Sequence, residues 1–433
     1  MRKNKVDIIT LGCSKNLVDS EQLLRQFAAN GYRIAHDPAK VNGEIVVVNT
    51  CGFIGEAQEE SIRMILEIGE AKRQGRISQL YVMGCLPERF AKEMQAELPE
   101  VDRFYGKFNW KELLKDLGKS YHHDLASERV LTTPAHYAYL KIAEGCNRSC
   151  SYCSIPLMTG PYRSRAMEDI AHEVRSLTRQ GVREFQLIAQ DLTYYGLDRY
   201  KRLALPELLT RLSDMPDVEW IRLHYAYPSL FPYDLLPIMR ERPNVCKYID
   251  IALQHISNAM LKRMRRNITR EETYQLLERI RTEVPGIHLR TTLMVGHPGE
   301  TEKDFGELVD FIKKIRFERM GAFTYSHEEG TYSYTCYKDD IPSAIKQERL
   351  DTLMGIQEKI SEEINAGKKG KVLKVIIDRE EDEFYIGRTE FDSPEVDPEV
   401  LVSKEKPLVP GCFYNIRIDK TDIFDLYGQP IKS

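Results

Sequence analysis

Continuous apolar runs alternate with helical patterns in the first part of the chain. The runs Ile8–Gly12, Ile45–Thr50 and Leu80–Gly84 are followed by helical patterns at Ser20–Asn30, Glu56–Gln74 and Pro87–Leu98. Apolar runs that do not alternate with polar residues favour parallel strands covered on both faces. The pattern therefore predicts an N-terminal parallel-sheet α/β domain, which we place at residues 4–121.

Six more strand-like runs, separated by helical patterns, follow in the middle of the chain. They are Tyr137–Ala143, Phe185–Ala189, Trp220–His224, Tyr248–Leu253, Ile287–Val295 and Gly321–Tyr325. This alternation predicts parallel strands joined by right-handed crossovers. We expect a central α/β domain at residues 132–363, built as a partial (β/α)6 barrel with polar strand-end residues lining its active site.

The last part of the chain changes to short β-rich runs with turn residues between them. These runs are Val372–Ile377, Phe384–Arg388, Phe413–Ile418 and Ile423–Leu426, and they follow Gly367 and Gly370. Short strands of this kind predict a small β-barrel of the OB type. We place it at residues 366–433.

Composition narrows the class of protein. A chain of 433 residues is long enough for three domains, and its formal net charge of −4 offers no overall basic field to a polyanionic partner. The apolar run within Met1–Leu11 is too short for a secretory signal, and no stretch is long enough to span a bilayer. We expect a cytoplasmic protein with no membrane partner. Nine cysteines in such a chain indicate metal binding rather than a disulfide framework, with Cys246, Cys336 and Cys412 expected to be packing residues.

Cys146, Cys150 and Cys153 lie in one short loop directly after an apolar run. Three thiolates in such a loop can bind three irons of a cubane iron–sulfur cluster, which leaves the fourth iron open to a small molecule. The alternative is structural zinc, which takes four ligands, usually from two separated Cys-x-x-Cys pairs. No second pair occurs in this domain, so the cluster is the favoured interpretation.

A second set of cysteines, Cys13, Cys51 and Cys85, follows the three N-terminal apolar runs. One cysteine at a strand end is usually a small buried hydrophobe. Three at equivalent strand ends are expected to meet, because the carboxyl ends of parallel strands gather at one edge of a sheet. We interpret them as ligands of a second cluster with an open iron, with zinc as the weaker alternative.

Polar residues also follow the strand-like runs of the middle domain. They occur in Gln190-Asp191, His224-Tyr225, Gln254-His255 and the segment from Gly296 to Thr301. Any one of them could be a loop residue with satisfied hydrogen bonds, and for His224 and His255 this is the slightly favoured interpretation. Gln190 is the first candidate for contact with a bound cofactor.

These motifs resemble a known family. The loop from Cys146 to Cys153, with an aromatic residue before its last cysteine, resembles the radical S-adenosylmethionine (SAM) superfamily. Gly12-Cys13-Ser14-Lys15-Asn16 with Asp19-Ser20-Glu21, then Asn49-Thr50-Cys51-Gly52 and Gly84-Cys85-Leu86, resemble the N-terminal domain of its methylthiotransferases. The resemblance covers nearly the whole chain, and the C-terminal part resembles a TRAM domain.

The resemblance implies an enzyme with two 4Fe-4S clusters that consumes two S-adenosyl-L-methionine per turnover. Cys146, Cys150 and Cys153 would hold the cluster that cleaves S-adenosylmethionine, and Cys13, Cys51 and Cys85 the cluster that presents a sulfur. An external electron donor such as flavodoxin or ferredoxin would reduce the enzyme. No side chain is assigned a catalytic role beyond cluster binding.

Further segments indicate the substrate. Ala189–Gly196, His224–Pro228 and Glu328–Thr331 resemble the branch that methylthiolates the β-carbon of an aspartate in small-subunit ribosomal protein number twelve. The partner would be that protein or the ribosome. Two alternatives stay open: a tRNA adenosine methylthiotransferase, and a non-catalytic iron–sulfur protein that binds RNA.

The charge of the C-terminal domain bears on this choice. Residues 365–433 contain 11 Lys and Arg against 14 Asp and Glu, and residues 378–405 contain 3 against 11. RNA-binding barrels need a basic groove, because phosphate contacts carry most of the affinity. An acidic domain makes tRNA an unlikely partner and favours a basic ribosomal protein. The alternative is a solvated acidic face with no partner.

Overall fold

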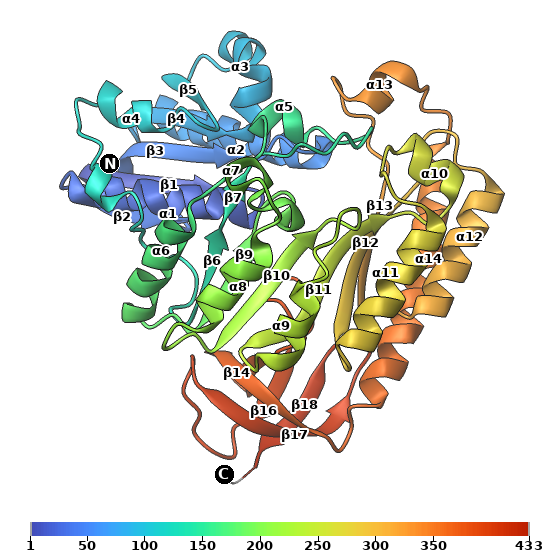
Figure 1. The fold of residues 1–433 in the computed structure, drawn as a ribbon. Helices are drawn as coiled ribbons and strands as arrows, with labels where there is room; N and C mark the ends of the chain where they lie inside the picture. Colours follow the sequence, from blue (N-terminus) through green and yellow to red (C-terminus); the bar gives the residue numbers. More distant parts are fainter. Residues whose placement is uncertain (1, 432–433) are drawn as a thin grey trace.

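The computed structural model describes residues 2–431. Three units follow one another along the chain: an N-terminal sheet, a large open barrel and a small closed barrel (Figure 1). Each unit corresponds to one of the three domains expected from the sequence, while the exact domain limits stay predictions.

The N-terminal unit is a parallel sheet with the order β2-β1-β3-β4-β5. Apolar side chains on both faces of β3 are buried, as expected for strands between two layers of helices. The strands are β1 (Arg2–Thr10), β2 (Arg33–His36), β3 (Gly43–Thr50), β4 (Gln79–Gly84) and β5 (Arg103–Gly106); the helices are α1 (Ser14–Ala29), α2 (Gly55–Arg73), α3 (Cys85–Glu97) and α4 (Lys111–Asp116). A short 3-10 helix, η1 (His123–Leu125), precedes the middle unit.

The middle unit is a parallel sheet with the order β13-β12-β11-β10-β9-β6, and its helices cover the outer face (Figure 1). Its strands are β6 (Tyr137–Lys141), β9 (Glu184–Ile188), β10 (Trp220–Ala226), β11 (Val245–Gln254), β12 (His288–Val295) and β13 (Arg319–Thr324). Its main helices are α6 (Met167–Arg179), α8 (Leu205–Ser213), α9 (Leu235–Glu241), α10 (Asn258–Arg263), α11 (Arg270–Glu283), α12 (Glu302–Ile315) and α14 (Ser343–Ala366). Short elements complete it: β7 (Ala143–Glu144), β8 (Arg163–Ser164), α5 (Ile155–Thr159), η2 (Leu192–Tyr194), α7 (Leu197–Tyr200) and α13 (Tyr332–Cys336).

The C-terminal unit is a closed barrel with the order β14-β15-β16-β18-β17. Its strands are β14 (Val372–Glu380), β15 (Phe384–Thr389), β16 (Val400–Ser403), β17 (Phe413–Thr421) and β18 (Leu426–Pro430). Val375, Val402, Ile416 and other apolar side chains fill its interior. Closure leaves no unpaired sheet edge.

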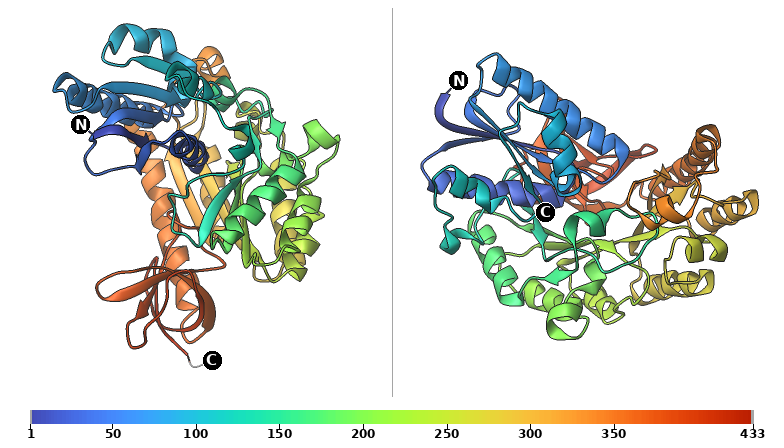
Figure 2. Two further views of the ribbon diagram at one scale, coloured as in Figure 1. Left: turned by 90° about the vertical axis from the view of Figure 1, so that its left-hand side faces the viewer. Right: turned by 90° about the horizontal axis from the view of Figure 1, so that it is seen from above.

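The three units pack against one another. Seen from above, the helices of the middle unit form an outer arc, and the N-terminal unit lies against the open side (Figure 2). Helix α1 contacts β6, and α3 contacts α5. The small barrel lies beneath the amino ends of the middle strands, where Ile376 and Phe413 pack on Trp220 and Tyr248 (Figure 1). No helix among residues 2–431 is long and apolar enough to cross a membrane.

The expected fold class is confirmed, and several element boundaries differ from the sequence prediction. Four-residue strands β2, β5 and β16 were missed. β2 and β5 are short and partly polar, and β16 is mostly apolar but only four residues long. The strand expected at Ile423–Leu426 is wrong, since β18 begins only at Leu426. Helices α1 and α3 begin next to their cysteines rather than at Ser20 and Pro87.

Candidate functional site

A cavity of about 540 Å³ lies where the three units meet. All six cysteines of the two predicted sets line it, together with strand-end residues of the middle unit and residues 393–396 of the small barrel. The N-terminal set and the loop set therefore face one shared chamber, although they belong to different units. We call them the N-terminal triad (Cys13, Cys51, Cys85) and the loop triad (Cys146, Cys150, Cys153).

The N-terminal triad forms at the carboxyl edge of the N-terminal sheet. Cys13, Cys51 and Cys85 follow the adjacent strands β1, β3 and β4, so the topology brings them together. Two glycines allow the close approach. A Cβ on Gly12 would lie 2.7 Å from Cys51 Cβ, and one on Gly52 would lie 2.9 Å from the backbone oxygen of Cys85. Side chains larger than hydrogen at these two positions would push the cysteines apart.

A buried lysine lies beside the N-terminal triad. Lys107 Nζ donates hydrogen bonds to Asn16 Oδ1 at 3.0 Å and Asp19 Oδ2 at 2.7 Å. Asn16 Nδ2 in turn donates to the backbone oxygens of Leu11 and Thr50, both at 3.0 Å. These bonds tie the loops that carry Cys13 and Cys51 to one positively charged group.

The loop triad lies between β7 and α5, and hydrogen-bond donors point at its sulfurs. Arg266 Nη1 donates to Cys150 Sγ at 3.1 Å, and the backbone N–H of Arg148 donates to Cys146 Sγ at 3.4 Å. The hydroxyl of Tyr227 lies 3.5 Å from Cys150 Sγ. Such N–H and O–H contacts to sulfur are among the features that set the potential of protein-bound iron–sulfur clusters.

Burial shapes the acidity of the thiols. It raises the pKa of Cys85 to about 12 and that of Cys146 to about 11. Cys13 differs: burial would raise its pKa, but Lys15 and Lys107 and backbone N–H groups together lower it below its ordinary value. Cys13 is exposed, and the surface it exposes faces the cavity. A metal that binds thiolates would supply the positive charge that the buried thiols lack.

Residues 2–431 contain no group of three or more His, Cys, Asp or Glu side chains placed to hold a single metal ion. A cubane cluster does not need such convergence, because each iron takes its own thiolate. Two sets of three cysteines facing one chamber therefore fit two clusters as donor sets.

Gln190 lies two residues after the end of β9 and on the cavity wall, as expected from the sequence. Its Nε2 donates to Glu144, which is also paired with Lys141 at 2.8 Å. Its Oε1 is buried and has no hydrogen-bond partner in the described part of the chain. An orphaned acceptor at this place fits contact with a bound ligand, so the role of Gln190 stays a prediction with a structural basis.

The other strand-end candidates divide into two groups. His224, Tyr225 and Gln254 line the cavity, and His224 Nε2 lies 2.7 Å from Gln186 Oε1. Two others serve structure instead. His255 Nδ1 accepts hydrogen bonds from the backbone of Ile256 and Ser257, and Thr301 caps helix α12 in a capping box with Asp304.

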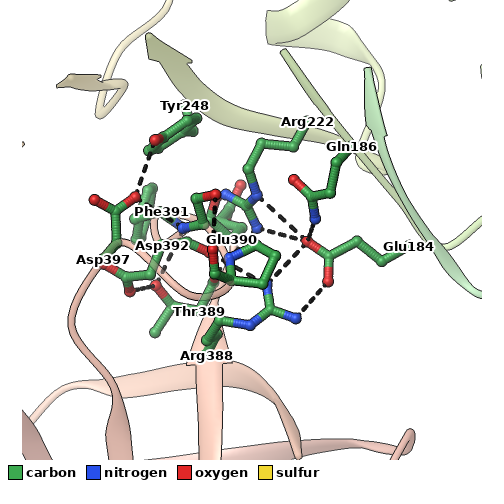
Figure 3. A network of polar contacts seen from close by, with 12 residues as sticks. Glu184, Gln186, Arg222, Tyr248, Arg388, Thr389, Glu390, Phe391, Asp392 and Asp397 are labelled. Atoms are coloured by element: carbon green, nitrogen blue, oxygen red, sulfur yellow. Dashed lines mark hydrogen bonds and ion pairs between the residues drawn. The ribbon is translucent and has the colours of Figure 1, made fainter. Parts of the chain in front are cut away.

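The floor of the cavity comes from the small barrel. The segment between β15 and β16, residues 390–399, enters the middle barrel at the amino ends of its strands (Figure 3). Asp397 Oδ2 accepts a hydrogen bond from the Tyr248 hydroxyl at 2.9 Å, and Asp392 Oδ1 pairs with Arg319 at 2.5 Å. Glu395 accepts hydrogen bonds from the hydroxyls of Tyr137 and Tyr139 at 3.0 and 3.1 Å. The C-terminal domain is thus part of the chamber wall.

A buried ion network fixes this floor in place. Glu184 of β9 pairs with Arg222 at 3.0 Å and with Arg388 at 2.8 Å (Figure 3). Arg388 also pairs with Asp378 at 2.6 Å. Asp378 accepts a further contact from His136 Nε2 at 2.7 Å. Burial opposes charge here, yet the pKa of Asp378 falls to about 2, because Arg388 and His136 stabilise its carboxylate.

This network corrects the charge argument made from the sequence. Four acidic residues of the 378–405 segment already have partners. Asp378 pairs with Arg388 and His136, and Asp392, Glu395 and Asp397 bind groups of the middle barrel. They are not part of a free acidic surface. Glu380, Glu381, Asp382, Glu383 and Glu405 remain exposed. The acidity available to a partner is smaller than the sequence count suggested.

Several residues of the site could not be found from the sequence. Lys107 and Arg266 carry no recognisable motif, and residues 393–396 belong to a domain far along the chain. His122 and His123 lie outside the cavity, and His136 serves the buried ion network.

Three family models match the chain. They are the Radical SAM superfamily at residues 140–312, Uncharacterized protein family UPF0004 at residues 5–106 and the TRAM domain at residues 370–431. Together with the open barrel and the loop triad at its mouth, they define the protein as a radical SAM enzyme, a class that uses a 4Fe-4S cluster and S-adenosyl-L-methionine.

Curated relatives are similar over the full length. The chain is 73% identical to ribosomal protein uS12 methylthiotransferase RimO of Parabacteroides distasonis, over 99% of each chain. It is 66% identical to the protein of that name from Porphyromonas gingivalis, over 99% of each chain, and 63% identical to that from Bacteroides fragilis, over 100% of each. The chain belongs to the RimO family of methylthiotransferases.

Solved structures support the fold. The radical S-adenosylmethionine methyltransferase TsrM from Kitasatospora setae superposes with a TM-score of 0.53 at 15% identity, over 75% of each chain. The cobalamin-dependent radical enzyme OxsB gives a TM-score of 0.52 at 14% identity, over 82% of this chain and 56% of the other.

Proposed function

We propose that this enzyme adds a methylthio group to the β-carbon of an aspartate in ribosomal protein uS12. It would use two 4Fe-4S clusters and two S-adenosyl-L-methionine per turnover. The observation that carries the proposal is the shared chamber, which both cysteine triads line. Sulfur transfer to a carbon radical needs both centres close to one substrate atom, since carbon radicals react indiscriminately.

The residues fit the two clusters as donor sets. Cys146, Cys150 and Cys153 would hold one cluster, and Cys13, Cys51 and Cys85 the other. When bound, the clusters supply reductive cleavage of S-adenosyl-L-methionine to a carbon radical, and the sulfur that replaces the abstracted hydrogen. The chain itself binds the thiolates, positions the substrate and excludes water. The buried Arg266 supports Cys150 by its hydrogen bond, and Gln190 offers its free oxygen to a bound ligand.

The substrate assignment follows the family name of the relatives, all of which are called uS12 methylthiotransferases. The remaining exposed acidic residues of the small barrel suit a basic ribosomal protein better than tRNA. We place the reaction in the cytoplasm, where ribosomes are found, with a flavodoxin or ferredoxin as electron donor.

Deletion and complementation test the substrate. In cells lacking the gene, mass spectrometry of uS12 is expected to show loss of the methylthio group, and the wild-type gene should restore it. The C150A variant should not restore it, because its loop triad lacks one thiolate. Methylthio groups in tRNA, measured in the same cells, are expected to stay unchanged. A loss confined to tRNA would contradict the assignment.

Iron content tests the two centres. Anaerobically reconstituted enzyme is expected to bind about eight iron atoms, as two cubane clusters require. A variant with Cys13, Cys51 and Cys85 all changed to alanine should bind about four, because only the loop triad remains. Elemental analysis and electron paramagnetic resonance of the reduced protein measure both values. Stoichiometric zinc at either triad would exclude the cluster there.

A further inference from the structure

Among residues 2–431, five cationic side chains line the cavity, and four of them have a carboxylate or sulfur partner. Lys107 pairs with Asp19 at 2.7 Å, Arg148 with Asp191 at 2.6 Å, Arg290 with Asp397 at 3.6 Å, and Arg266 donates to Cys150 Sγ at 3.1 Å. Lys15 is the fifth. Within residues 2–431 it has no carboxylate within the 4.0 Å that defines an ion pair.

Lys15 is nevertheless buried. Only 8% of the residue is exposed, and it lines the cavity. Its Nζ lies 3.5 Å from the centre of the Tyr225 ring. An aromatic face attracts a cation, but it does not replace the hydrogen bonds that an ammonium group loses on leaving water. The Lys15 ammonium group therefore faces the cavity without a carboxylate partner among residues 2–431.

Tyr225, whose ring contacts the Lys15 ammonium group, belongs to the middle unit. It lies near the end of β10, has a positive φ of 60°, and is 36% exposed. Non-glycine residues in this backbone conformation cluster at functional sites. Lys15 belongs to helix α1 of the N-terminal unit, two residues after Cys13. The pair therefore bridges the two units at the level of the N-terminal triad.

We propose that Lys15 binds the side-chain carboxylate of the substrate aspartate. This inference rests on the proposed function, and it names the group that recognises the reacting residue. A carboxylate bound at Lys15 would complete the missing ion pair, and its β-carbon, one bond away, would lie inside the chamber that both triads line. Lys15 then selects aspartate over its neutral isostere asparagine, because only the carboxylate neutralises the buried ammonium.

The test compares two substrates with two enzymes. The substrates are uS12 and a uS12 variant whose modified aspartate is changed to asparagine. The enzymes are reconstituted wild type and K15M, each assayed for kcat/KM of methylthiolation and for equilibrium binding of uS12 without reductant. Wild type is expected to prefer aspartate roughly 10- to 100-fold, the range of one charge-assisted hydrogen bond. The preference should fall to within about twofold in K15M, and K15R should recover part of it.

The chain offers a matched control in Lys374. Its Nζ also lies over an aromatic ring, that of Phe413, at 4.4 Å, but it is outside the cavity. K374M should keep the full preference for aspartate. Iron content of K15M should equal that of wild type, because Lys15 is not a ligand.

Three results would overturn the assignment. An unchanged preference in an iron-loaded K15M would exclude Lys15 alone and leave the proposed function standing. Loss of iron in both K15M and K15R would assign Lys15 to the cluster instead of the substrate. Absence of uS12 methylthiolation by the wild type would overturn the proposed function, and the assignment of Lys15 with it.

Discussion

Changing Cys150 to alanine is expected to abolish reductive cleavage of S-adenosylmethionine, while changing Cys51 to alanine should leave that cleavage largely intact and stop sulfur transfer. Cys150 belongs to the loop triad, where Arg266 and Tyr227 also contact its sulfur. Cys51 belongs to the N-terminal triad, whose structural supports, Asn16 and Lys107, come from the N-terminal unit. The two centres should therefore be separable by mutation.

The measurement is 5′-deoxyadenosine and methylthiolated uS12 formed by each reconstituted variant under reduction. C150A should give no 5′-deoxyadenosine above background, and its iron should fall from about eight to about four atoms. C51A should form 5′-deoxyadenosine without methylthiolated product. Cys412 is exposed and lies outside both triads, so C412A serves as the control and should keep both activities. Equal loss of both products in C150A and C51A would contradict separate roles.

The sequence was sufficient to group the six cysteines into two sets of three, for a simple physical reason. Parallel strands end at a common edge, so Cys13, Cys51 and Cys85 had to meet once their apolar runs were recognised as adjacent strands. The grouping of the loop triad can be predicted without knowing the fold, since its three cysteines are close together in the chain. The order of the three units and the class of each fold followed from the same periodicity.

The features that could not be predicted from the sequence depend on contacts between segments that are far apart in the chain. Asp378 and Asp392 look like surface charges in sequence, but Asp378 pairs with Arg388 on the neighbouring strand of the small barrel. Asp392 finds its partner Arg319 only when the small barrel docks. Lys107 and Arg266 likewise become candidate site residues only because the fold places them beside the cysteine triads. Strand β16 was also not predicted, because four residues are too few to show a strand pattern. It is stabilised by pairing with β15 and β18. Charge counts along a chain therefore describe a surface only after ion pairs between domains are removed.

The buried network beneath the cavity leads to the second prediction, a large loss of stability in R388M. Arg388 is buried and pairs with both Glu184 and Asp378, so its removal leaves two carboxylates without their main cation. Breaking a buried pair in this way costs about 3–5 kcal/mol of unfolding free energy. Because residues 393–396 line the cavity, loosened docking of the small barrel should also raise KM for uS12. Denaturant unfolding of the protein and steady-state kinetics measure the two effects.

Arg379 supplies the matched control, since it lies in the same β-barrel and pairs with Glu399 at 2.7 Å on the exposed surface. R379M should cost at most about 1 kcal/mol, because exposed ion pairs contribute little. The quadruple variant E184L/R222M/R388M/D378L removes the buried charges together, Arg222 included, and is expected to recover part of the stability lost in R388M, since paired charges replaced by apolar groups are often tolerated. If R388M and R379M were equally stable, the network would not be what holds the small barrel against the amino ends of the strands, and the cavity floor would depend on the apolar contacts of Trp220 and Phe413 instead.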